Sequence, residues 1–138
     1  MADDQQEKAE QMEQLRYMYN MYLQKYEAIL NDISMYSQAQ VILQRNTELM
    51  DKLDMVKNTN TLVALEGGVY LDAKIADAKR VMVYVGGGYT LEKTPSEAKE
   101  FFMNSERAEK ALLGKLNEEK LMTERELQNI VASLDSMK

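Results

Sequence analysis

An apolar repeat with an average spacing of 3.5 residues runs through the first fifty residues of the sequence. Positions spaced alternately by three and four residues are apolar or aromatic at ten of twelve places, and only Gln40 and Thr47 are polar. The twelve positions are Met12, Leu15, Tyr19, Tyr22, Tyr26, Ile29, Ile33, Tyr36, Gln40, Leu43, Thr47 and Met50. Such a repeat keeps one stripe of a helix against a partner helix. It predicts a coiled-coil helix from about Gln6 to Val56, on the order of 70 Å long.

Helix-breaking residues are concentrated in the middle of the chain. Five of the six glycines lie between Gly67 and Gly88, the only proline is Pro95, and residues 1–60 contain neither residue type. After Met50 the repeat reaches Asp54 and Lys57, so we expect the coiled coil to end there. Asn and Thr at 58–61 favour caps and turns. The chain is therefore predicted to form a long helix, a compact β region and a second long helix.

Four short strands are expected between the helices, at residues 62–65, 69–75, 80–85 and 89–92. Turns at Gly67-Gly68 and Gly86-Gly87-Gly88 would make two successive β-hairpins. The second glycine cluster is not a phosphate-binding loop, because the Lys-Ser/Thr pair and the following helix of such loops are missing. Four strands leave open edges and cannot close a barrel, so the β region requires a partner sheet, most simply from another subunit.

The second helix has a clear N-terminal signal. Thr94, Pro95 and Glu97 place a capping hydroxyl, a proline at the first helical position and a carboxylate at the third. The helix should run to about Ser136. Its apolar positions are Ala98, Phe101, Phe102, Ala108, Leu112, Leu116, Leu127, Ile130, Leu134 and Met137, and the polar residues Lys115, Glu119, Lys120 and Thr123 interrupt them.

These elements predict a mainly α fold with a small β part: a long antiparallel coiled-coil hairpin joined through two β-hairpins, with both chain ends together. We expect one domain, residues 1–138. Its parts are an N-terminal coiled-coil helix at 1–57, a double β-hairpin for oligomerisation at 58–94 and a C-terminal coiled-coil helix at 95–138.

The composition excludes several classes of function. The formal charge of −6 opposes binding to nucleic acid. The chain has no Cys and no His, which removes thiolate chemistry and the usual zinc and haem ligands. The sequence shows no signal peptide and no apolar stretch that could span a membrane, so we expect a cytoplasmic protein without a membrane partner.

The central segment resembles the alpha class of prefoldin. The resemblance covers Thr61–Ile75 and Arg80–Lys93, followed by the capped helix with Glu97 and Ala98. The double hairpin with its two glycine turns carries this resemblance, because beta-class prefoldins have one hairpin. The flanking helices agree with the family in length and order. The compact length suggests an archaeal type.

The resemblance implies an ATP-independent chaperone. Two alpha-class and four beta-class subunits would form a hexamer, in which the hairpins assemble into inter-subunit β-barrels and the coiled coils project from them. The coiled-coil ends would hold unfolded client proteins and transfer them to a group II chaperonin. A structural or filament-forming assembly protein of the same family is the alternative.

Two residue sets are the candidate sites. The tip residues, at the free ends of the helices, would contact clients: Met12, Leu15, Tyr17, Met18, Tyr19, Leu127, Ile130, Val131, Leu134 and Met137. Met and Tyr suit promiscuous binding. The competing interpretation is ordinary coiled-coil core, which is strongest for the seam positions and weakest for Tyr17, Met18 and Val131.

The hairpin residues would form barrel core and subunit interface: Leu62, Val63, Leu65, Val69, Leu71, Val81, Val83, Val85, Tyr89 and Leu91. The alternative is a local core within one chain. Neighbouring carboxylates such as Asp51 with Asp54, or Glu118 with Glu119, lie on charge-rich helix faces and are expected to be solvated. We therefore predict no enzyme activity, no catalytic residues, no metal site and no cofactor.

Overall fold

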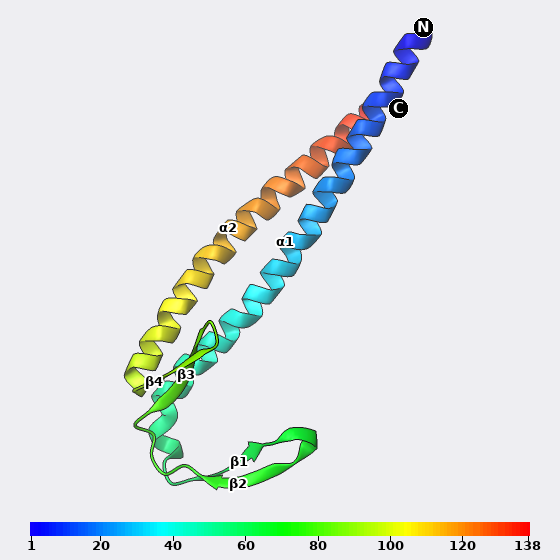
Figure 1. The fold of residues 1–138 in the computed structure, drawn as a ribbon. Helices are drawn as coiled ribbons and strands as arrows, with labels where there is room; N and C mark the ends of the chain where they lie inside the picture. The colour runs from blue at the N-terminus through cyan, green and yellow to red at the C-terminus, as the bar shows by residue number, and fades with distance from the viewer. The chain divides into compact units, whose positions relative to one another are not determined.

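The computed structural model describes residues 1–138 (Figure 1). The elements follow in the order α1 (Ala2–Val56), β1 (Asn60–Ala64), a short 3-10 turn (Glu66–Gly68), β2 (Tyr70–Lys74), β3 (Val81–Gly86), β4 (Tyr89–Lys93) and α2 (Pro95–Ser136). The predicted fold class, two long helices with two β-hairpins between them, is confirmed. The chain divides into two compact units, which are described separately: unit 1 is Met1–Gln38 with Glu109–Lys138, and unit 2 is Ala39–Ala108.

Helix α1 begins four residues earlier than the sequence predicted, at Ala2 instead of Gln6. Asp3 and Asp4 lie in its first turn, where negative charge complements the helix dipole. The helix ends at Val56, and Asn58 adopts the left-handed conformation with φ 61°. Its amide donates to the Ile75 carbonyl at 2.8 Å, which ties the end of α1 to the end of β2. Asn is one of the few residues that tolerate this conformation.

The apolar repeat forms the seam of the helix pair in both units. All twelve predicted positions of α1 are half-buried or buried, and Ile29 is the most enclosed at 5% exposure. On α2 the buried seam residues include Ala98, Leu116 and Ile130. The helices run antiparallel within each unit. Polar contacts join Tyr26 to Glu124 in unit 1 and Asp51 to Lys99 in unit 2.

The seam departs from the prediction at two places. The expectation that it ends after Met50 was wrong, because Leu53 and Val56 follow at spacings of three and are half-buried. On α2, Ala108 and Leu112 are exposed, and the half-buried neighbours are instead Glu109 and Leu113. Spacings that depart from strict alternation of three and four shift the stripe around a helix, so residues on either side of such a shift were assigned to the wrong face.

Thr123 does not interrupt the seam, contrary to the prediction. Its side chain is 3% exposed, and its hydroxyl donates to the Glu119 carbonyl at 2.7 Å. A hydroxyl satisfied by its own helix can occupy a buried position without an unpaired donor. Lys120 is half-buried. The α2 stripe is therefore continuous through its polar middle.

The first hairpin pairs β1 with β2 antiparallel, with Val63 opposite Leu71 and Leu62 opposite Asp72. Its strands start one or two residues away from the predicted limits, at Asn60 and Tyr70. Gly67 and Gly68 form the tight connection with φ values of 69° and 80°, which a side chain would strain. The Leu65 amide donates to the Val69 carbonyl at 2.8 Å and closes the turn.

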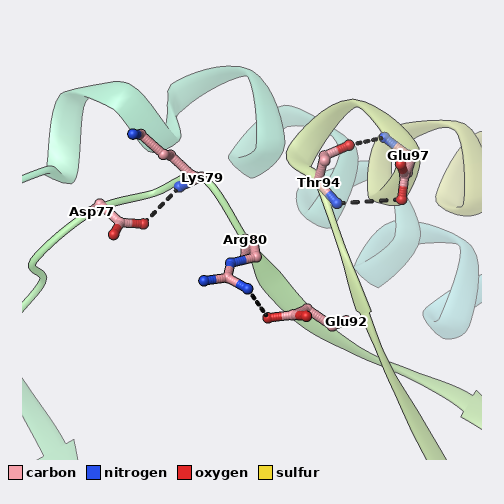
Figure 2. A network of polar contacts seen from close by, with 6 residues as sticks. All are labelled: Asp77, Lys79, Arg80, Glu92, Thr94 and Glu97. Carbon is pink, nitrogen blue, oxygen red and sulfur yellow. Dashed lines mark hydrogen bonds and ion pairs between the residues drawn. The ribbon is translucent and has the colours of Figure 1, made fainter.

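The second hairpin pairs β3 with β4, with Val83 opposite Leu91 and a bulge between Tyr84 and Gly86. Figure 2 shows the polar contacts before β3 and after β4. Asp77 accepts the Lys79 amide at 3.0 Å, and Arg80 forms an exposed ion pair with Glu92 at 3.1 Å. Both contacts lie where the chain enters the hairpin, and each is exposed.

The predicted capping box opens α2 (Figure 2). The Glu97 amide donates to Thr94 Oγ1 at 3.2 Å, and the Thr94 amide donates to Glu97 Oε2 at 3.4 Å. The reciprocal bonds satisfy two amides that have no partner within the helix. The ammonium of Lys93 lies 5.6 Å from the centre of the Phe101 ring, a cation–π contact that links β4 to the first turns of α2.

Candidate apolar binding surfaces

The tip residues separate into two groups in unit 1. Met12, Leu15, Tyr19, Leu127, Leu134 and Met137 are half-buried, and Ile130 is buried. These seven lie on the seam and contribute to packing between α1 and α2. Tyr17, Met18 and Val131 are exposed, with Tyr17 at 67%. Only these three of the ten are exposed within a single chain.

The exposed residues of α1 line two adjoining grooves along one side of the helix. The first, of about 520 Å³, is lined by Glu10, Glu13, Gln14, Tyr17 and Met18. The second, of about 310 Å³, is lined by Met18, Met21, Tyr22 and Lys25. Met18 belongs to both grooves, so they join. We call Tyr17, Met18, Met21 and Tyr22 the apolar track.

Met21 was missed from the sequence, although it is 54% exposed and lies in the middle of the apolar track. The sequence nevertheless contains a spacing that indicates this position. Met21 follows Met18 by three positions and Tyr17 by four, the spacing of neighbours on one helix face. It was overlooked because the seam positions Tyr19 and Tyr22 dominate the pattern on either side of it.

A third groove lies between the helices near their ends. It has about 220 Å³ and is lined by Met12, Arg16, Val131, Leu134, Asp135 and Lys138. Here the structure brings together three of the predicted residues, Met12, Val131 and Leu134, with polar neighbours from both helices. Residues 2–11 of α1 are exposed at every position, so this part of the helix has no partner from α2.

A polar contact crosses the seam farther along unit 1. The Tyr26 hydroxyl donates to Glu124 Oε1 at 2.9 Å. This hydrogen bond raises the pKa of Tyr26 above its ordinary value of 10.0, and desolvation and the negative charge of Glu124 act in the same direction. The phenol therefore stays neutral in neutral solution and holds the two helices in one register.

The hairpin residues form the second surface, in unit 2. Leu62, Val63, Leu65, Val69 and Leu71 of the first hairpin are all exposed, as is Tyr70. In the second hairpin Tyr89 and Leu91 are exposed and Val81 and Val85 are half-buried. Val83 is buried at 5% exposure, so it belongs to the core of its own chain.

Opposite faces of the first hairpin both carry large apolar side chains. Val63 and Leu71 are partners in the ladder and share one face, whereas Leu62 and Tyr70 belong to the other. An antiparallel sheet in water ordinarily has one polar face. A two-stranded hairpin with two exposed apolar faces is marginal in isolation and requires a covering surface.

A groove of about 490 Å³ runs beside β3 in the same unit. Its lining comes from α1, from β3 and from Phe102 of α2, and comprises Asn46, Leu49, Met50, Leu53, Val81, Met82, Val83, Tyr84 and Phe102. Met82 and Tyr84 are exposed along it. The second hairpin therefore packs on the helices through Val83 and still leaves an apolar margin open.

The charged groups do not converge on a reactive centre. Asp51 forms an ion pair with Lys99 at 2.7 Å, while Asp54, Glu118 and Glu119 lie on exposed helix surface. Gly86, Gly87 and Gly88 form the β3–β4 turn, all with positive φ. No helix combines the length and the hydropathy needed to cross a bilayer.

Comparisons with known proteins agree with this arrangement. A family model described as prefoldin subunit matches residues 22–137. Human prefoldin subunit 5 is 32% identical over 93 residues, which cover 64% of this chain and only 58% of that protein. Prefoldin subunit alpha of Methanocorpusculum labreanum is 27% identical over 135 residues, which cover 92% of each chain.

A solved structure gives the same fold. The cryo-EM structure of a filamentous PFD from Methanocaldococcus jannaschii aligns with a TM-score of 0.57, covering 88% of this chain and 96% of that chain. The sequences are 16% identical, so this similarity concerns the fold.

Proposed function

This chain belongs to the prefoldin family as an alpha-type subunit, and from that premise we propose that it holds unfolded proteins without ATP and transfers them to a group II chaperonin. The family is a non-enzymatic chaperone family, and its subunits assemble with other prefoldin subunits. The tip residues are the proposed client-binding site, and the hairpin residues other than Val83, which is buried within its own chain, are the proposed oligomer interface. The proposed location is the cytoplasm, which suits a chain without cysteine.

One observation carries the client-holding proposal: three of the four apolar-track residues are exposed on a helix whose seam is already occupied. Tyr17, Met18 and Met21 lie outside the packing between α1 and α2, so coiled-coil stability does not explain them. Met adapts its shape to different partners, and Tyr buries a large area while tolerating water. Such a surface binds apolar segments of many sequences without a fixed complementary shape.

The seam members of the tip residues have a subsidiary role in this proposal. Met12 and Leu134 line the groove between the helix ends, where Val131 is exposed. A small separation of the two helix ends would enlarge this groove and expose further apolar surface. The remaining seam residues, including Ile130, keep the helices paired.

The assembly proposal follows from the two exposed faces of the first hairpin. Neighbouring subunits would cover Leu62 on one face and Val63 on the opposite face, and a closed barrel removes the open strand edges. We propose that two copies of this chain join four beta-class subunits in a hexamer. The groove beside β3 is the place where the second hairpin would extend the same interface.

Native mass spectrometry of the chain mixed with a beta-class subunit tests the assembly. A single species with two copies of this chain and four partners is expected. A Leu62→Lys/Leu71→Lys variant should fail to form it, because it places a charge on each face of the hairpin, and covering either face would bury a lysine. A matched Lys57→Glu variant, at an exposed residue after α1, should assemble normally. A mass that grows with concentration would favour the filament-forming alternative, and it would contradict the closed hexamer.

Holding and transfer are tested with a denatured client protein. The assembly should suppress client aggregation in the absence of nucleotide, and added group II chaperonin should take the client up. Deleting residues 1–22 and 129–138, which removes the whole apolar track, should abolish suppression while the mass of the remaining assembly corresponds to the hexamer. Full suppression by that truncated hexamer would show that clients bind elsewhere.

A further inference from the structure

The apolar track has an acidic end. Residues 1–14 contain Asp3, Asp4, Glu7, Glu10 and Glu13 against one basic residue, Lys8, which gives a side-chain charge of −4 (1 − 5). Two of these carboxylates, Glu10 and Glu13, line the same groove as Tyr17 and Met18. At the other end of the track the lining residue is Lys25. Apolar side chains thus lie between a negative end and a positive end.

The carboxylates of the groove are not neutralised within the chain. The three ion pairs of the structure are Arg80 with Glu92, Lys99 with Asp51 and Lys138 with Asp135, so Glu10 and Glu13 have no cationic partner. Residues 2–11 are exposed at every position and carry no covering segment. The helix dipole offsets negative charge chiefly within the first turn, which Glu10 and Glu13 lie beyond.

The carboxylates of Glu10 and Glu13 lie next to apolar side chains in one groove, which suits a ligand that has a cation next to an apolar segment. Glu13 precedes Tyr17 by four positions and Glu10 precedes it by seven, so the three lie on one helix face. At physiological salt a carboxylate acts over about 8 Å, which reaches a charge next to the groove and not one far away. Tyr17 also lines this groove, and an aromatic ring attracts a cation over its face.

We propose that this surface selects client segments in which a Lys or Arg directly flanks a run of apolar residues, with the cation lying toward Glu10 and Glu13. The inference rests on the proposed function, because it names the class of client that the tip residues hold. A segment flanked by acidic residues would meet uncompensated carboxylates at the same place. The apolar contacts provide binding, and the carboxylates determine which apolar segments are favoured.

Fluorescence anisotropy on the assembled complex tests the selectivity. Three labelled peptides share one Leu/Phe core and differ only in flanking residues, which are Lys, Ser or Glu. The Lys-flanked peptide should bind about fivefold more tightly than the Glu-flanked one at low salt, a factor typical of a few exposed charge contacts. The ratio should fall toward one at high salt.

Two charge variants separate a local effect from net charge. Glu10→Gln/Glu13→Gln should remove most of the preference of the complex for Lys over Glu flanks, while the Ser-flanked peptide binds as before. Glu118→Gln/Glu119→Gln removes the same number of charges from exposed positions of α2 and should leave the preference unchanged. Equal binding of the Lys-flanked and Glu-flanked peptides, or an undiminished preference in the Glu10/Glu13 variant, would overturn the inference. If none of the three peptides binds and denatured clients aggregate freely, the proposed function itself fails.

Discussion

The Tyr26 hydroxyl and Glu124 Oε1 lie 2.9 Å apart and join α1 to α2 across 98 positions of sequence. Tyr26 is a half-buried seam position, and its hydroxyl donates to the carboxylate of the facing helix. This combination fixes the longitudinal alignment of the helices in unit 1, because a shift of either helix by one turn would separate the two groups. The alignment of the two helices in turn places Met12 of α1 beside Leu134 of α2 in the groove near the helix ends.

Stability in alkaline solution should depend on Tyr26. The hydrogen bond to Glu124 raises its pKa above 10.0 in the folded state. A group whose pKa is raised by folding stabilises the native state below its unfolded pKa and loses that contribution as pH rises through the folded value. The difference in Tm between wild type and Tyr26→Phe should therefore be constant near neutral pH and shrink above about pH 10. Thermal melts at increasing pH measure it, and a difference that does not shrink would contradict the assignment.

Alanine substitutions at two adjacent residues of α1, one buried in the seam and one exposed, should differ in how much they lower the free energy of unfolding. Ile29 is 5% exposed, whereas the adjacent Leu30 is 38% exposed. Ile29→Ala should lower the free energy of unfolding by about 2–4 kcal/mol, because it removes buried methyl groups and leaves a cavity. Leu30→Ala should cost less than about 1 kcal/mol. Chemical denaturation of both variants gives the comparison, and equal losses would refute the register of the seam.

The capping box should stabilise the start of α2. Thr94→Ala removes the hydroxyl that accepts the Glu97 amide and should cost about 1 kcal/mol. Ser96→Ala is the control, since Ser96 is exposed in the same turn and its hydroxyl makes no hydrogen bond within the chain. Thermal melts should show a lower Tm for the first variant only. A Thr94→Ala protein with the same Tm as wild type would mean that the cap contributes nothing to stability.

Two glycines should respond in opposite directions to alanine. Gly114 lies in the interior of α2 with open space where a Cβ would stand, so Gly114→Ala should raise stability by about 0.5–1 kcal/mol. Gly87 has φ +60° in the β3–β4 turn, and Gly87→Ala should cost about 1 kcal/mol or more. Denaturation midpoints of the two variants provide the test. A destabilised Gly114→Ala would imply a kink or a close contact at that position.

The sequence predicted what depends on periodicity and turn chemistry. The α1 seam, the end of α1 near Asn58, the capping box at Thr94 and the two glycine turns all follow from local rules that tertiary packing did not override. The seam of α2 was harder to predict from the sequence, because it contains Thr123, a polar residue whose side chain is nevertheless buried. Its hydroxyl bonds to the Glu119 carbonyl, and a one-dimensional apolar pattern contains no information about that bond.

The candidate surfaces could also be predicted from the sequence only in part. Exposure of Tyr17 and Met18 could be anticipated, since both lie beside the seam. Only the three-dimensional structure shows that Met21, Glu10 and Glu13 line the same pair of adjoining grooves. Val83 was placed with the other hairpin residues because it alternates with Val81 and Val85, yet it packs within its own chain. Alternation identifies the apolar face of a strand and does not say which chain covers it.

Light scattering of a denatured client in the presence of the assembled complex, without nucleotide, tests the client-holding role most directly. Three versions of the chain are compared after their equal assembly mass has been established: wild type, Tyr17→Ser/Met18→Ser/Met21→Ser, and the control Leu30→Ser/Met35→Ser. Met35 matches Met21 at 54% exposure and lies two heptads away on α1. Wild type and control should suppress aggregation, and the apolar-track variant should not. Suppression by all three alike would contradict the assignment of client binding to the apolar track.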